Sequence, residues 1–395
     1  MKRDSRFDIA KGFLILLVVW GHFTQIHFSV NTPGFLVRWI HLFHMPAFAF
    51  LAGYFSSDKS NQTKKFFSFL VPLVVIQIAG LTIDYYFLNF KTLASMNILQ
   101  PRLGLWFLGS LIIWRIFLLP IFKEIQTIYA IIIASALGII SGTSEDFGSF
   151  MMLNRTFGFF PFFLIGAFSK NKKIIWQKFE MRQIAYTSII FFISSIAICY
   201  AIKDLPWKYL GFMNTPETFR TIHTDLSELI FIAIPGRILS YLLRFAFIAA
   251  ILSIIFYSWK KESAWLKKQA PGILTLLKKA NRAIPLKKFG QFSMYIYLLH
   301  MLIIQPLQHL NFSVPNHLIF LHLIVGEELF QIIISFTICV ALCYMLTSKQ
   351  IRFIFKNILQ PDMSWLLKQK SRQAQIVQFQ PKQTDPSDQF KTGQG

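Results

Sequence analysis

Long apolar segments alternate with short charged segments along most of the chain. The apolar segments recur at lengths near the roughly twenty residues that an α-helix needs to cross a bilayer. The pattern predicts ten membrane spans, at about 7–28, 35–55, 66–88, 104–122, 125–141, 150–169, 183–202, 234–258, 289–309 and 320–346. We therefore expect an all-α, polytopic integral membrane protein with one membrane domain over residues 1–346.

Composition and charge support this class and orient it. Hydrophobic residues make up 54% of the 395 residues, and 44 of them are Phe. The net charge of +22 would also suit nucleic acid, but 29 of the 40 Lys and Arg fall in predicted cytoplasmic segments, against six in external loops and five within spans. By the positive-inside rule this bias predicts that both termini are cytoplasmic, and it argues for the lipid bilayer rather than nucleic acid as the partner.

Other features narrow the class further. The three cysteines lie in apolar spans without metal-ligand spacing, so neither disulfides nor a metal site is expected. The basic, apolar N-terminus lacks a small-residue cleavage site and is interpreted as a retained first helix. Residues 347–395 form a basic cytoplasmic tail, expected to be disordered because its end is rich in Gln, Lys, Ser and Asp.

The first span carries the strongest chemical signal. His22 lies in an apolar run, and Lys11 precedes it with ten residues between them. Eleven helical steps place the two side chains on one face, about 16 Å apart along the axis, and Asp8 shares that face. An interior histidine that only packs is the alternative, but an acid, a base and an imidazole in one stripe favour a functional site.

Two further spans hold candidate residues that each have two interpretations. His44 lies near the predicted middle of the second span, close to Pro46, which we expect to bend the helix, and either a site or a packing role fits it. His41 is read as interfacial. Trp106 opens the fourth span, where an aromatic belt at the membrane surface is the simpler interpretation of a residue that can also bind substrate.

The sixth and ninth spans complete the set. Arg155 is a fixed charge a few residues below the outer surface, and it requires an acidic partner, a group of carbonyls or an anionic ligand unless it snorkels to the interface. His300 falls near the midplane of the ninth span. Tyr295 lies five residues earlier and so on a different helix face, which makes the two separate candidates.

The order of these motifs resembles the acyltransferase 3 family of membrane O-acyltransferases. The motifs are Arg6-x-Asp8-x-x-Lys11-Gly12, Gly21-His22, Phe43-His44-Met45-Pro46, Leu105-Trp106-Phe107, Arg155 with Phe160-Pro161-Phe162-Phe163, and Ser293-x-Tyr295-x-Tyr297-Leu298-x-His300. The likeness covers about residues 6–346 and looks most like the branch labelled fucose 4-O-acetylase-like. The family's motif of a basic residue, ten residues and a histidine maps onto Lys11 and His22, with Lys where Arg is also found.

The resemblance implies transfer of an acyl group, usually acetyl from acetyl-CoA, to a hydroxyl of a cell-surface glycan or of its lipid-linked precursor. It also implies a multi-pass protein of the cell membrane, here the bacterial cytoplasmic membrane. Many members carry an additional extracytoplasmic esterase-like domain. The sequence shows none, so any such partner is expected to act in trans.

Roles follow from this chemistry. His22 is the expected general base for a sugar hydroxyl, with an acyl-histidine intermediate as an alternative, and Arg155 or His44 is expected to stabilise the thioester oxygen. Lys11 is expected to bind CoA phosphate, with Asp8 orienting it; Trp106, His300 and Tyr295 are candidate substrate contacts. A transporter or flippase without acyl transfer, and a membrane sensor, remain the competing functions, although no inverted repeat is visible.

Overall fold

The computed structural model describes residues 4–27, 34–56, 62–87, 99–141, 151–170, 182–203, 234–257, 282–309 and 327–362, with a few single positions between 267 and 279. All described residues up to Pro361 belong to one compact unit. Its helices are α1 (Ser5–His27), α2 (Gly34–Tyr54), α3 (Gln62–Phe87), α4 (Trp106–Ile112), η2 (Ile113–Leu118), α5 (Leu119–Lys123), α6 (Thr127–Ile140), α8 (Leu153–Ser169), α10 (Arg182–Ala201), α12 (Ile234–Phe256), α15 (Leu286–Gln291), α16 (Ser293–His309), α18 (Glu327–Leu346) and α19 (Lys349–Leu359).

The predicted all-α, polytopic class is confirmed, since the described residues form helices without strands and seven helices are long and apolar enough to cross a membrane. Each of the ten predicted spans contains a helix. Helices α6 and α16 are apolar but shorter than the seven, and α8 has 17 residues. The number of crossings and the cytoplasmic position of the termini therefore stay predictions.

Three expectations need correction. Residues 104–122 are not one regular helix but α4, the π-helical η2 and α5, and the ninth span is interrupted at Phe292 between α15 and α16. Residues 349–359 were assigned to a disordered tail, yet they form α19, because the Ser348 side chain caps its first turn and apolar residues pack against the core. The tail from 363 lies outside the described residues.

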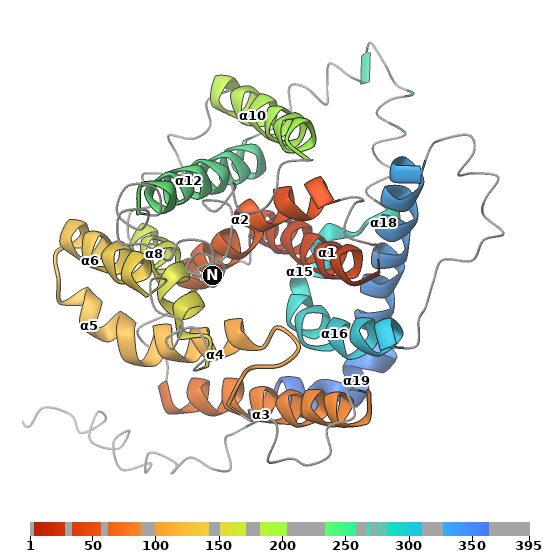
Figure 1. Ribbon diagram of the computed structural model, residues 1–395, viewed down its shortest axis with the longest axis horizontal. Helices are drawn as coiled ribbons and strands as arrows, with labels where there is room; N and C mark the ends of the chain where they lie inside the picture. Colours follow the sequence, from red (N-terminus) through yellow and green to blue (C-terminus); the bar gives the residue numbers. More distant parts are fainter. Residues whose placement is uncertain are drawn as a thin grey trace, which may run out of the picture. The chain divides into compact units, whose positions relative to one another are not determined.

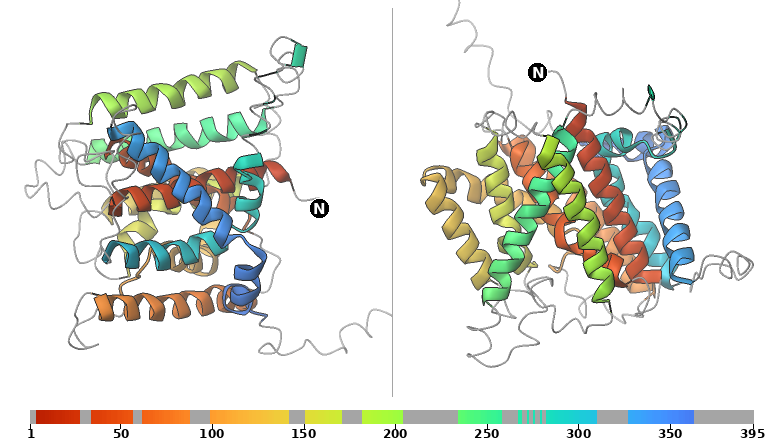
Figure 2. Two further views of the ribbon diagram at one scale, coloured as in Figure 1. Left: turned by 90° about the vertical axis from the view of Figure 1, so that its right-hand side faces the viewer. Right: turned by 90° about the horizontal axis from the view of Figure 1, so that it is seen from above.

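Helix α1 lies at the centre of this unit. Figure 1 shows α1 with α2, α12, α15, α16 and α18 around it, and Figure 2 shows most of the long helices running side by side. In the most apolar window of α1, 72% of residues are buried, against 17% in α3 and in α10. A polar side chain on α1 therefore faces protein, whereas the apolar outer faces of α3 and α10 suit lipid.

Glycines let two helix pairs meet backbone to backbone. A Cβ at Gly53 of α2 would strike the carbonyl of Phe163, and a Cβ at Gly166 of α8 would strike the carbonyl of Phe50. The same reciprocal arrangement joins Gly12 of α1 to Gly290 of α15. Small residues at helix crossings permit this close packing in membranes. Both contacts fix the elements that carry the candidate residues.

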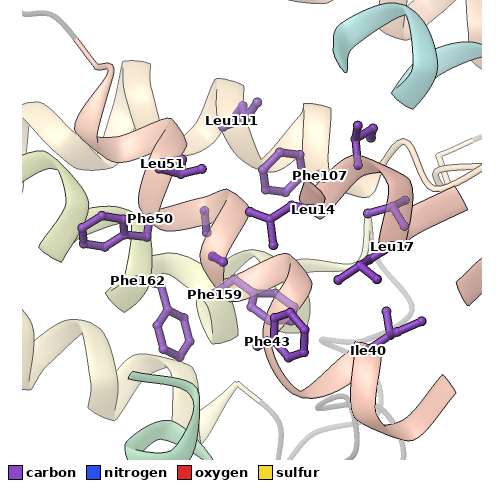
Figure 3. Packing of buried hydrophobic residues seen from close by; sticks show 14 of the residues in the cluster. Leu14, Leu17, Ile40, Phe43, Phe50, Leu51, Phe107, Leu111, Phe159 and Phe162 are labelled. Atoms are coloured by element: carbon purple, nitrogen blue, oxygen red, sulfur yellow. The ribbon is translucent and has the colours of Figure 1, made fainter. Parts of the chain in front are cut away.

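Aromatic side chains fill the interior between α1, α2, α4 and α8. Figure 3 shows Leu14, Phe43, Phe107 and Phe159 converging from these four helices. Phe43 also stacks on Phe247 of α12, with ring centroids 5.0 Å apart. Large rings bury much apolar area with few rotatable bonds, so this packing holds the surrounding polar groups in place.

The segment before α4 lies beside the middle of α3. The Gln77 amide donates to the carbonyl of Gln100 (2.8 Å) and accepts from the backbone N–H of Arg102 (2.9 Å). Arg102 also pairs with the buried Asp84 at 3.1 Å. Because non-helical backbone at membrane depth must be satisfied by protein, these contacts explain how the chain enters α4 at that height.

The π-helical segment η2 has a local cause. The N–H of Leu119 bonds to the carbonyl of Trp114, five residues back. Pro120 follows, and its ring crowds the carbonyl four residues before it, which disfavours a regular α-helical turn there. The wider turn positions Trp114 so that its indole N–H donates to the Thr156 carbonyl at 2.8 Å. This bond ties η2 to α8.

Candidate active site

Helix α1 supplies the polar stripe that the sequence predicts. Asp8 is 1% exposed and pairs with Lys11 at 3.2 Å. Lys11 is half-buried, and its ammonium also lies 5.2 Å from the centroid of the Phe55 ring. The backbone contact between α1 and α15 at Asp8 and Gly290 holds this end of the helix. The ion pair leaves the ammonium of Lys11 oriented but not enclosed.

Four histidines gather around the C-terminal half of α1. The rings of His22 and His300 lie 5.5 Å apart between centroids, and those of His41 and His44 lie 5.0 Å apart. Gly21 links the two pairs, because a Cβ there would lie 4.0 Å from the His41 ring. The electrostatic partners of His22 are His300, His41, His44 and Arg155. We call His22, His41, His44 and His300 the histidine cluster.

Backbone carbonyls fix the tautomer of three members. The Nδ1 atoms of His41 and His44 lie 2.7 Å and 2.6 Å from the carbonyls of Val37 and Ile40. His300 Nδ1 lies close to two carbonyls of its own helix. Since a carbonyl can only accept, Nδ1 carries the hydrogen in the neutral ring and Nε2 keeps its lone pair. Three of the rings therefore present proton acceptors.

Two arginines approach the histidine cluster over aromatic faces. The Arg155 guanidinium carbon lies 5.5 Å from the centroid of a Trp106 ring, and that of Arg244 lies 5.8 Å from the centroid of Phe159. Trp106 and Phe159 stack on each other at 5.3 Å. Both guanidinium groups also interact electrostatically with His41. Permanent positive charge is thus concentrated beside the imidazoles.

A cavity of about 240 Å³ opens along α1 on the side of Lys11. Its lining comes from α1, α2, α4, η2 and α16, with Phe55 just after α2, and is mostly apolar: Lys11, Ile15, Val18, Met45, Phe48, Leu51, Ala52, Phe55, Phe107, Leu108, Leu111, Arg115, Ser293, Met294 and Tyr297. Along α1 the lining ends at Val18, one helical turn before His22. We call this space the α1 cavity.

A second cation lines the α1 cavity. Arg115 donates to the Ala52 carbonyl at 3.1 Å and lies over Phe69. Its Nε is buried and has no hydrogen-bond partner in the described part of the chain. Lys65 interacts electrostatically with Arg115 and with Lys170. Arg115 therefore contributes a second positive charge to the cavity wall.

The structure brings together His22, His44, His300 and Arg155, which the sequence singled out on four separate spans. Tyr295 is elsewhere: it is buried next to Phe292, and its electrostatic partner is Arg352 of α19. Trp106 does not form an interfacial belt, because it is 8% exposed and lies among Arg155 and Phe159. Its indole ring contacts the Phe159 ring and the Arg155 guanidinium instead of lipid.

Sequence reasoning missed other members of the site. From the sequence, His41 is interpreted as interfacial, and Arg244 is not singled out among the five basic residues within predicted spans. Tyr297 lines the α1 cavity, and its hydroxyl donates to the Gly104 carbonyl at 2.7 Å. An arginine inside an apolar span was the available signal for Arg244. No comparable signal separates Tyr297 from Tyr295, because only the rotation of α16 decides which ring faces the cavity.

The arrangement suits proton transfer and stabilisation of negative charge. Imidazole lone pairs can accept a proton from a hydroxyl, and the nearby guanidinium groups can stabilise an oxyanion. Within the described residues, no group of three or more histidine, cysteine or acidic side chains is placed to hold a metal ion. The side chains that are present offer acid–base and electrostatic chemistry.

Comparisons with known proteins agree with the family resemblance. The family model described as "Acyltransferase domain" matches residues 4–348. The chain is 42% identical over 65 residues to Nodulation protein NolL of Sinorhizobium fredii, a segment that covers 15% of this chain and 18% of that protein.

A second relative gives a similar result. The chain is 44% identical over 59 residues to Nodulation protein NolL of Mesorhizobium japonicum, covering 14% of this chain and 16% of the relative. The match therefore spans less than a fifth of the length of either curated relative. No solved structure matches the chain significantly. Because the family model covers most of the chain, including every candidate site residue, the protein belongs to the acyltransferase 3 family.

Proposed function

We propose that this protein is a membrane O-acyltransferase that moves an acetyl group from acetyl-CoA to a hydroxyl of a cell-surface glycan or its lipid-linked precursor. The observation that carries the proposal is the position of His22 within the histidine cluster, one helical turn beyond a cavity that begins at Lys11. A base on α1 and a cavity along the same helix suit acyl transfer, because the cavity can hold the donor while the base acts on the acceptor. Family membership supports the same reaction class.

His22 acts as the general base in this proposal. It removes the proton of the acceptor hydroxyl while the oxygen attacks the thioester carbon, the new C–O bond forms and the C–S bond breaks. The proton then passes to the departing thiolate, which leaves as CoA thiol. Arg155 or His44 stabilises the negative charge that develops on the carbonyl oxygen. An acyl-histidine intermediate on His22 is the alternative order of the same bond changes.

The donor enters from the cytoplasmic side in this scheme. Lys11, held by Asp8, binds phosphate of CoA, and Arg115 on the same cavity adds a second cation. The pantetheine arm lies along the apolar wall of the α1 cavity and brings the thioester toward His22, about 16 Å from Lys11 along the helix. Burial keeps water away from the thioester.

The acceptor is assigned by chemistry and family. A glycan hydroxyl would reach the histidine cluster from the outer side, opposite the donor, where Trp106 and His300 are candidate contacts. The fucose 4-O-acetylase-like motifs support a sugar hydroxyl as the nucleophile. We place the protein in the bacterial cytoplasmic membrane, with an esterase-like or glycan-assembly protein as a partner in trans.

The test is acceptor-dependent transfer of labelled acetyl from acetyl-CoA by the purified protein in lipid nanodiscs, with isolated membrane glycan as acceptor. We expect His22→Ala to lower the rate by at least about 10²-fold, the usual contribution of a general base, while the protein still inserts and purifies. Gln25→Ala, an exposed position on the same helix, is the matched control and should retain activity.

The result also separates the competing functions. Label transfer that depends on His22 supports the enzyme. Movement of glycan across proteoliposome membranes without label transfer would instead support a transporter or flippase. Near-normal acylation by folded His22→Ala would refute the assignment of the base.

A further inference from the structure

We infer that His300 is a positioning residue for His22: its Nε2 accepts an N–H from the His22 ring and so turns the other His22 nitrogen toward the acceptor hydroxyl. The inference rests on the proposed function and assigns His300 a role in the reaction in place of the substrate contact expected from the sequence. Four observations carry it: the anchoring of His300, its nitrogen without a partner among the described residues, a His22 ring without a hydrogen bond to any described residue, and the proximity of the two rings.

The His300 ring is rigidly held. It is 1% exposed, and its Nδ1 lies 2.9 Å from the carbonyl of Ile296 and 2.8 Å from that of Tyr297. Both carbonyls require a hydrogen on Nδ1, so the neutral ring keeps its lone pair on Nε2. The side chain therefore offers a fixed acceptor that cannot rotate away without losing both contacts.

The Nε2 of His300 is buried and has no hydrogen-bond partner among the described residues. Buried polar atoms without a partner are rare in native proteins, because each has given up its hydrogen bond to water. An unpaired acceptor inside an apolar bundle thus indicates a donor that arrives during the working cycle or lies close to hand.

His22 is a suitable donor close to this atom. The two ring centroids are 5.5 Å apart and the planes are inclined by 38°. Two imidazoles joined by an N–H···N bond of ordinary length have centroids roughly 5 Å apart. A movement of about half an ångström therefore closes the bond, and catalytic hydrogen bonds are commonly longer before substrate binds.

Among the members of the histidine cluster, His300 is the one placed to orient the His22 ring. Its ring has no hydrogen bond to another described residue, whereas His41 and His44 are each anchored to their own helix and face each other. A general base must present its lone pair in one direction, and a partner on the opposite nitrogen provides that orientation. Of the three other members of the cluster, His300 is the one in ring contact with His22.

The reaction stays balanced with this assignment. One His22 nitrogen takes the hydroxyl proton as the C–O bond forms, and it returns that proton to the CoA thiolate after the C–S bond breaks. The other nitrogen keeps its hydrogen throughout, donated to His300. His300 remains neutral and touches neither acetyl group nor hydroxyl, so removing it should lower kcat more than it raises KM.

Two substitutions test which His300 nitrogen matters. A Gln amide reaches about where Nε2 lies, whereas an Asn amide reaches only the position of Nδ1. We expect His300→Gln to retain at least about a tenth of wild-type kcat, and His300→Asn and His300→Leu to lose about 10- to 100-fold, with KM for acetyl-CoA changed less than about threefold. Met301→Leu, the adjacent buried residue, is the control for packing.

The outcomes separate this inference from the proposed function. Equal loss in His300→Gln and His300→Asn, or wild-type kcat in His300→Leu, would overturn the positioning role while leaving His22 as the base. Activity in His22→Ala would remove the base itself. Should His300→Leu fail to insert, the comparison between Gln and Asn still decides, because the two side chains differ in reach but share one polar group.

Discussion

Replacing Lys11 tests whether the inner end of α1 recognises the nucleotide of the donor. Acetyl-CoA and S-acetylpantetheine carry the same thioester and the same flexible arm, but only acetyl-CoA has phosphates. Lys11 lines the α1 cavity with its side chain half-buried, so its ammonium is available to an anion at the mouth. We expect Lys11→Ala to impair the use of acetyl-CoA selectively and to leave S-acetylpantetheine almost unaffected.

The magnitude follows from one charged hydrogen bond. Hydrogen bonds to charged groups contribute about 1.5–3 kcal/mol, which corresponds to roughly 10- to 150-fold in kcat/KM. Lys11→Arg keeps the charge and should stay within about tenfold of wild type, since Arg also binds phosphate. Arg115→Gln should show the same selectivity for the phosphorylated donor. The assay is steady-state transfer of labelled acetyl with each donor in turn.

The buried Asp8 requires a control. Lys11→Ala leaves its carboxylate, 1% exposed, without the ammonium at 3.2 Å, and the loss of that charge partner is expected to destabilise the protein. The double variant Asp8→Asn with Lys11→Ala removes that cost. If both forms show the same preference between donors, recognition and not folding has changed. Equal losses with both donors would refute phosphate binding by Lys11.

Two further substitutions test the framework that holds the site. Gly53→Ala would drive a Cβ into the Phe163 carbonyl, so we expect a loss of about 1–3 kcal/mol or more and a lower melting temperature in detergent, whereas Gly109→Ala, with its nearest neighbour at 3.9 Å, should be tolerated. Asp84→Asn removes the charge partner of Arg102 at 3.1 Å, so we expect a lower melting temperature because the segment before α4 is held less firmly. An unchanged melting temperature would show that this ion pair is dispensable.

Much of the candidate site could be predicted because charge is so costly inside a membrane. His22, His300 and Arg155 stand out in apolar spans, and positions counted along each span place His22 and Arg155 at similar depths, with His300 somewhat deeper. The same reasoning could not rank His41 or Arg244, since depth does not determine which way a helix face points. The rotation of each helix about its axis, and the helices next to it, are determined by packing between residues far apart in the chain.

Irregular backbone was also beyond prediction. Hydropathy treats residues 104–122 as one apolar helix, because α4 and η2 are both mostly apolar. The π-helical turn depends on the geometry before Pro120, and the depth of the preceding segment depends on the amide of Gln77 in another helix. Such features arise from single hydrogen bonds, which average composition over a window does not register.

The electrostatic surroundings of His22 explain why an imidazole rather than a carboxylate suits this position. The electrostatic partners of His22 in the described part of the chain are three histidines and Arg155. A neutral base adds no charge to the apolar interior before substrate arrives, whereas a carboxylate would have to be desolvated there permanently. In the proposed mechanism, Arg155 can then act on the thioester oxygen as it becomes negative, instead of being neutralised by the base. Acid–base chemistry and charge stabilisation are thereby assigned to different side chains within one cluster.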